Sequence, residues 1–149
     1  MNKSDFFKSA DLLLSEVRTA VLSTVSADSE PRMRWMSPIF LKGREDYLYC
    51  VTSPAFNKTG DVKKNNKVQW LIQSKSLDRI ITLDGTIDIV ENISLRSEVI
   101  EKLGTALTPF WTVNDDTSNI IVLETSISSG VLFYPVKGRK EYVSFTGGN

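Results

Sequence analysis

The 149-residue chain contains no histidine and only one cysteine, and these two shortages exclude several classes of catalytic site. Without histidine, neither a Ser-His-Asp triad nor a Cys-His pair can be assembled. The usual zinc sites are excluded as well, because they need several histidine or cysteine ligands. We therefore expect no metal site and no catalytic side chain, and any enzymatic chemistry should come from an organic cofactor.

The chain also lacks a second cysteine, a long apolar run and an excess of charge of either sign. The lone Cys50 cannot form an internal disulfide, which suits a reducing cytoplasm, and its apolar neighbours predict a buried, inert thiol. No stretch approaches a membrane span in length, and acidic residues interrupt the N-terminal apolar positions where a signal peptide would have its core. Eighteen basic residues balance eighteen acidic ones, so we expect a cytoplasmic protein with neither a nucleic-acid nor a membrane partner.

The apolar residues that are present, 41% of the total, predict one domain over residues 1–149, built mainly of strands. A helix is expected from a cap at Ser4 to Val17, and another from about 94 to 103 with Gly104 as its stop. Strands are predicted at 19–25, 32–40, 47–52, 67–73, 79–90, 120–128, 130–136 and 140–145. The first three should form an antiparallel meander, and Gly85 should mark a bulge or a bend.

This order of elements indicates a mainly β fold, an antiparallel barrel with appended helices. Segments 19–25 and 79–90 carry apolar residues on both faces, which a closed or paired sheet would bury. A dimer interface over one face of the barrel would bury them equally well. We therefore expect a homodimer.

Two arginines on one predicted strand could bind an anion. Arg32 and Arg34 are two residues apart, so both point to one face of the strand, while Met33 and Trp35 point to the other. A guanidinium group matches the oxygens of a phosphate or a carboxylate. The alternative is a solvent-facing strand whose arginines pair with acids across the sheet.

The segment "VTSPAFNK" (51–58) places two hydroxyl side chains and a lysine at a strand-to-helix junction. Ser53 can cap a short helix that begins at Pro54 and runs through Lys64. The hydroxyls of Thr52 and Ser53, the N–H groups of the helix start and the charge of Lys58 together suit an anion. The alternative is a capped turn followed by a solvated lysine.

The order of these features resembles the pyridoxamine 5′-phosphate oxidase-like, FMN-binding split-barrel superfamily, particularly its general stress protein branch. The resemblance lies in "TAVLSTVSADSEPRMRWM", "YLYCVTSPAFNKTGDVKKNNKVQWLI" and "LDGTIDIV", and continues more weakly to the end of the chain. It implies a split antiparallel barrel of the FMN-binding type, a homodimer with flavin at its interface, and an FMN-dependent oxidoreductase activity. It implies these cofactor-binding residues: Arg34 (with Arg32 second), the backbone of Trp35 and Met36, Val51, Thr52, Ser53, Asn57, Lys58 and, from the partner, Trp111.

Departures from the family pattern argue against the oxidase reaction itself. The Ser-Arg-Lys of the oxidase phosphate loop is replaced by Phe56-Asn57-Lys58, and apolar Ile80 stands where a glutamine contacts the flavin. The arginine and histidine that bind the substrate phosphate near the oxidase C-terminus have no counterpart. The small-molecule substrate and the electron donor and acceptor stay open, as does replacement of FMN by a deazaflavin. The alternative function is a non-enzymatic split-barrel module that holds another ligand or none.

Overall fold

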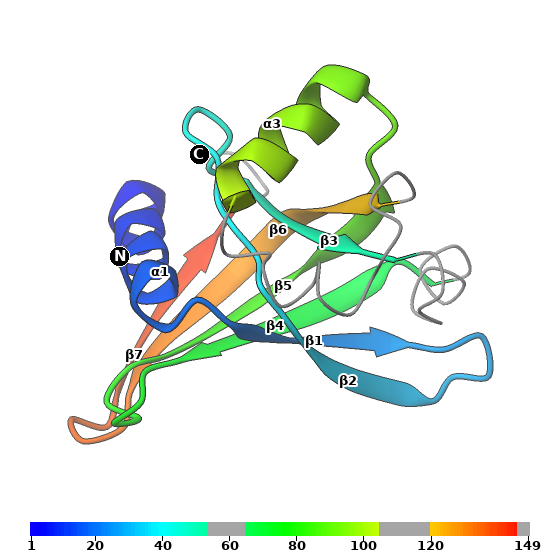
Figure 1. Ribbon diagram of the computed structural model, residues 1–149. Helices are drawn as coiled ribbons and strands as arrows, with labels where there is room; N and C mark the ends of the chain where they lie inside the picture. Colours follow the sequence, from blue (N-terminus) through cyan, green and yellow to red (C-terminus); the bar gives the residue numbers. More distant parts are fainter. Residues whose placement is uncertain (54–64, 105–119, 146–149) are drawn as a thin grey trace.

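The computed structural model describes residues 1–53, 65–104 and 120–145, which form one antiparallel sheet flanked by helices (Figure 1). The strands are β1 (Ala20–Val25), β2 (Pro31–Met36), β3 (Tyr47–Thr52), β4 (Lys67–Gln73), β5 (Ile80–Ile89), β6 (Ile121–Tyr134) and β7 (Arg139–Ser144). Their order is β2-β1-β4-β5-β6-β3, and β7 pairs with β6. The predicted mainly β fold is confirmed. The predicted helix ending at Lys64 and the predicted loop 105–119 fall outside the described residues.

Two helices in the described ranges pack against the curved sheet. Helix α1 (Lys3–Val17) places Phe6 and Leu13 in the main core, where they join fully buried residues such as Trp70 on β4. Helix α3 (Ile93–Leu103) covers a smaller core on the other face of β3 and β6. No helix in the described ranges is long and apolar enough to cross a membrane.

Strand β3 is buried on both faces, which explains its nearly uninterrupted apolar sequence. Leu48 and Cys50 point into the main core, whereas Tyr49 and Val51 point into the core beneath α3. The predicted burial of Cys50 is confirmed, since this thiol is only 1% exposed. A strand with cover on both sides needs no polar face.

The predicted meander is wrong at its third strand. β1 pairs with β2 as expected, but β3 pairs with β6 and meets the chain after β2 only at an isolated Ile39–Tyr49 bridge. β2 also ends at Met36, earlier than predicted, and Pro38 has no N–H to continue a ladder. β2 and β3 therefore stand at opposite ends of the strand order, and the barrel is split between them.

The strands predicted at 120–128 and 130–136 are a single strand, because β6 runs unbroken for 14 residues. A Cβ atom at Gly130 would lie 2.7 Å from Cε1 of Phe6, so this glycine makes room for the α1 ring. The predicted bulge at Gly85 is confirmed by a register shift between Asp84 and Gly85. The cap of α1 is Asn2 rather than Ser4, because the Asn2 side chain accepts the Asp5 N–H at 2.8 Å.

Candidate functional site

Arg34 lies on the barrel-core face of edge strand β2. It stands opposite Leu22 of β1, which is fully buried, and its Nη1 donates a hydrogen bond of 2.7 Å to Oγ1 of Thr24. Thr24 is itself fully buried, so this bond fixes the guanidinium group at the rim of the barrel interior. Met36, two residues further on, packs against the same core. Alternation along the strand therefore directs Arg34 and Met36 inward together.

The side chain of Trp35 points the opposite way, as the alternation predicts. Trp35 is 82% exposed and Met33 is 71% exposed, both on the outer face of β2. Only the backbone of Trp35 is placed to contribute to a site on the inner side. β2 pairs with β1 alone among the described strands, so its other edge offers backbone N–H and C=O groups.

Thr52, the last residue of β3, has a buried hydroxyl group with no partner. It shares the core-facing side of β3 with Leu48 and Cys50, and it is fully buried. Within the described part of the chain, its Oγ1 makes no hydrogen bond. A buried hydroxyl without a partner costs about 1–3 kcal/mol of stability. A polar ligand that accepted a hydrogen bond from this hydroxyl would remove that cost.

The residues next to Thr52 are placed differently from it. Val51 faces the core under α3, so its side chain points away from the barrel interior. Ser53 is half-buried and already has an interaction partner. The predicted contributors Asn57, Lys58 and Trp111 lie outside the described residues.

The strand directions bring the inward-facing residues of β1 and β3 to the same end of the barrel. Neighbours in the order β1-β4-β5-β6-β3 are all antiparallel, so β1 and β3 run in the same direction (Figure 1). Thr24, which holds Arg34, and Thr52 therefore both lie near the C-terminal ends of their strands. Of the predicted residues, Arg34, Met36 and Thr52 share the core-facing side of the split barrel.

A polar cluster that the sequence did not reveal joins Arg44, Tyr49 and Glu124. Tyr49 is fully buried; its Oη accepts a 2.6 Å bond from Arg44 Nε and donates a 2.7 Å bond to Glu124 Oε2. Arg44 Nη2 also lies 3.2 Å from Glu124 Oε2. Burial, together with the bond to Glu124, raises the pKa of the Tyr49 phenol, so it stays neutral at physiological pH. The cluster ties the turn before β3 to β6; the alternating tyrosines of "DYLYC" were its only signal.

Comparison with known proteins places this geometry in a family. A family model for "Pyridoxamine 5'-phosphate oxidase" matches residues 7–124. General stress protein 26 from Bacillus anthracis str. Sterne is a similar structure, with 20% identity and a TM-score of 0.73 over 94% of this chain and 98% of that one. No curated protein sequence matches the chain.

Two other similar structures differ in the ligands that their names describe. A FAD-binding protein from Mesorhizobium loti is 13% identical, with a TM-score of 0.66 over 83% of this chain and 90% of that one. HutZ, the heme storage protein from Vibrio cholerae, is 16% identical, with a TM-score of 0.67 over 90% of this chain and 95% of that one. At these identities the structures establish the split-barrel fold, and the family model spans the chain from α1 to β6. The chain therefore belongs to the pyridoxamine 5′-phosphate oxidase family.

Proposed function

We propose that this protein is an FMN-binding flavoprotein, an oxidoreductase of unassigned substrate that holds the cofactor where the barrel is split between β2 and β3. The observation that carries the proposal is the buried hydroxyl of Thr52 at the end of β3, which makes no hydrogen bond within the described residues. It stands where the family resemblance implies a cofactor phosphate contact.

The residues present fit a phosphate group. A phosphate monoester carries close to two negative charges at neutral pH and needs several donors when it is partly removed from water. Thr52 would donate its hydroxyl, and Arg34, oriented by Thr24, would supply the positive charge of its guanidinium group. The family resemblance adds Ser53 and Lys58 as two further groups that would contact the phosphate.

The flavin ring would lie along the edge of β2 that faces away from β1. Backbone groups of Trp35 and Met36 would serve its polar atoms, and the half-buried Met36 would supply apolar contact. Bound FMN supplies hydride transfer, whereas the chain anchors the phosphate, orients the ring and excludes water. Haem storage is not proposed, because the chain has no histidine to bind the iron.

The test is the identity of the small molecule that the purified protein carries. Mass spectrometry after denaturation should find FMN, and a titration of the stripped protein should show saturable FMN binding. A released deazaflavin would move the proposal to that cofactor. Failure of both flavins to bind would favour the alternative, a non-enzymatic barrel module.

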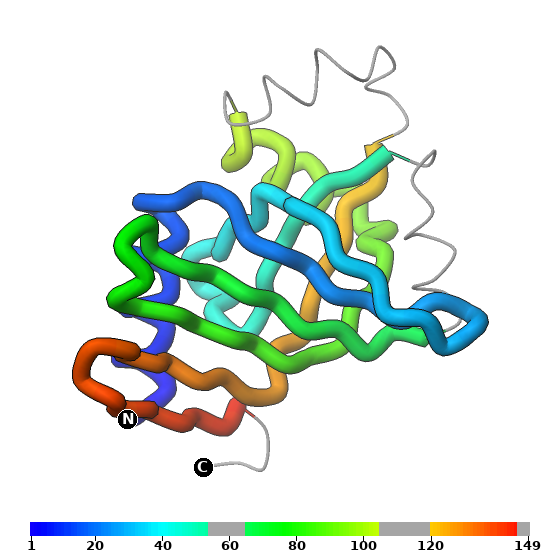
Figure 2. The backbone as a smooth tube through the Cα atoms, turned by 90° about the horizontal axis from the view of Figure 1, so that it is seen from below, coloured from blue at the N-terminus to red at the C-terminus, as the bar shows by residue number. Residues whose placement is uncertain are grey.

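We also propose that the protein is a homodimer that uses the outer face of the sheet. Figure 2 shows the strands from β2 to β7 laid side by side across this sheet. One row of directly opposed residues crosses it: Trp35, Val21, Leu71, Thr82, Val131 and Tyr142. Trp35 is 82% exposed and Tyr142 is 67% exposed at the two ends of this row, and a second copy of the chain would cover them. Light scattering at micromolar concentration should give twice the monomer mass.

A further inference from the structure

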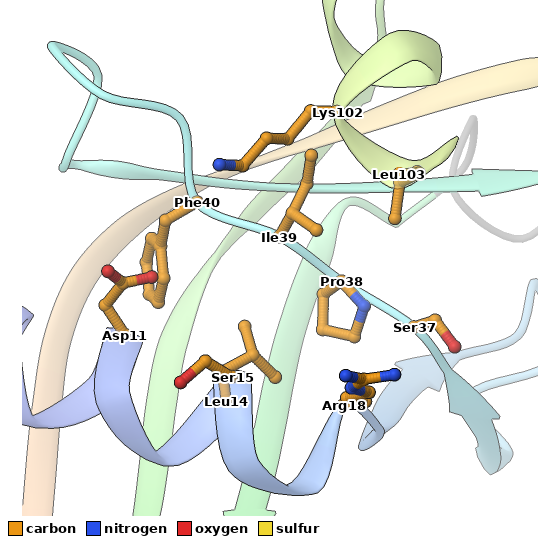
Figure 3. Close-up of a pocket in the computed structure, with 10 residues that line it drawn as sticks. All are labelled: Asp11, Leu14, Ser15, Arg18, Ser37, Pro38, Ile39, Phe40, Lys102 and Leu103. Atoms are coloured by element: carbon orange, nitrogen blue, oxygen red, sulfur yellow. The ribbon is translucent and has the colours of Figure 1, made fainter. Parts of the chain in front are cut away.

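A pocket lies between α1, the segment 37–40 and the end of α3 (Figure 3). Its volume is about 450 Å³, within the range of roughly 300–1,000 Å³ typical of small-molecule sites. The buried residues that line it are apolar: Leu14, Pro38, Phe40 and Leu103. This lining suits the hydrocarbon part of a ligand.

The rim of the pocket is charged, with two cations and one acid. Arg18 and Lys102 come from the ends of two different helices, and Asp11 comes from the middle of α1. In Figure 3, Arg18 lies beside Pro38 and Ser37, whereas Lys102 extends toward the side where Asp11 and Phe40 lie. No hydrogen bond or ion pair joins these three charged side chains to any residue in the described ranges. The lining therefore carries one net positive charge that the described fold does not neutralise.

The backbone of Arg18 makes its position unusual. It forms the C-cap of α1 with φ 64°, in the left-handed region, and its N–H donates to the Leu14 carbonyl at 2.7 Å. Glycine adopts this conformation without the cost that a side chain imposes. Because glycine would form this cap at lower cost, the cap alone does not account for an arginine at this position.

We propose that this pocket binds a small organic monocarboxylate with an apolar body. The guanidinium group of Arg18, with the Ser37 hydroxyl beside it, would take the carboxylate. The apolar lining would bury the body, and Lys102 would add long-range attraction. A single negative charge matches the net charge of the lining better than a phosphate dianion does, because Asp11 repels the second charge. This proposal does not rest on FMN binding.

The experiment is an NMR titration of the ¹⁵N-labelled full chain with 4-phenylbutanoate and with its neutral amide, 4-phenylbutanamide. The acid should cause saturable shifts at the amides of 14–18, 37, 39–40 and 102–103, and the neutral amide should bind at least roughly fivefold more weakly. Arg18→Gly should weaken binding of the acid by roughly fivefold, since an exposed ion pair contributes about that factor. It should not lower the melting temperature, because glycine suits the left-handed cap.

Three further variants separate charge from folding. Lys102→Gln should weaken binding of the acid, and Asp11→Asn should strengthen it, a gain that damage to the fold would not produce. Lys8→Gln, on an exposed part of α1 outside the pocket, is the matched control and should change nothing. Equal affinity for acid and neutral amide, unchanged affinity in Arg18→Gly, or no saturable binding of the acid would each overturn the proposal.

Discussion

Replacing Thr52 by valine should have opposite effects on stability and on cofactor binding. Valine keeps the shape of the side chain and removes the hydroxyl, which is fully buried and has no partner among the described residues. Burying such a group costs about 1–3 kcal/mol, so its removal should leave the cofactor-free protein equally stable or up to roughly that much more stable. FMN should bind more weakly, because a phosphate donor has been lost.

Thr125 on β6 provides the matched control. It is also fully buried, but its Oγ1 accepts a 3.0 Å bond from Nε1 of Trp70, whose side chain is fully buried too. Thr125→Val would leave the indole N–H unpaired and should destabilise the protein by about 1–3 kcal/mol. In a chain of this length that lowers the melting temperature by about 2–4 °C per kcal/mol.

Urea unfolding of the stripped proteins measures the two effects directly. The urea midpoint should lie at or above that of wild type for Thr52→Val and below it for Thr125→Val. If Thr52→Val lost as much stability as Thr125→Val, the Thr52 hydroxyl would have to be satisfied within the fold. It would then no longer be evidence for a ligand.

Three further predictions concern the fold and the assembly. Gly85→Ala should destabilise the protein by more than about 2 kcal/mol in urea unfolding, because its Cβ would meet the Ser126 carbonyl oxygen and lie 2.9 Å from Thr125 Cγ2; near-neutral behaviour would contradict this. The pKa of Tyr49 is raised above its unfolded value of 10.0, so its stabilising effect is complete below pH 10 and declines above it. Tyr49→Phe should lower stability at pH 7 and flatten that alkaline decline, and an unchanged pH profile would refute the assignment. Trp35→Glu should convert the proposed dimer into folded monomers by sedimentation analysis, whereas an intact dimer would place the interface elsewhere.

The local pattern of the sequence was enough to predict most of the elements and the direction of the side chains on β2. Alternation placed Arg34 on one face and Trp35 on the other, and the structure confirms this. Pairing between distant strands was not predictable in the same way. The short turn before β3 suggested a meander, but the apolar residues on both faces of β3 are satisfied by pairing with β6 and by cover from α3.

Gly130 shows a second limit of sequence reasoning. The sequence predicts separate strands at 120–128 and 130–136, whereas Gly130 lies within β6 and makes room for Phe6, more than a hundred residues earlier in the chain. The same limit applies to the sites. Thr52 was a candidate by motif, but its missing hydrogen-bond partner is visible only in the fold, and the pocket beside Arg18 brings together residues from three separate segments.

The most direct test of the central claim is calorimetric titration of FMN and riboflavin into wild type, Lys58→Ala and the control Lys63→Ala. Losing one partner of a partly buried ion contact costs on the order of 2–5 kcal/mol, so Lys58→Ala should weaken FMN binding at least roughly tenfold. Riboflavin lacks the phosphate, so it should bind wild type weakly and respond little to the Lys58 change. Lys63→Ala should bind both ligands as wild type does. If Lys58→Ala binds FMN as tightly as wild type, the segment 51–58 is a capped turn and the phosphate site is refuted.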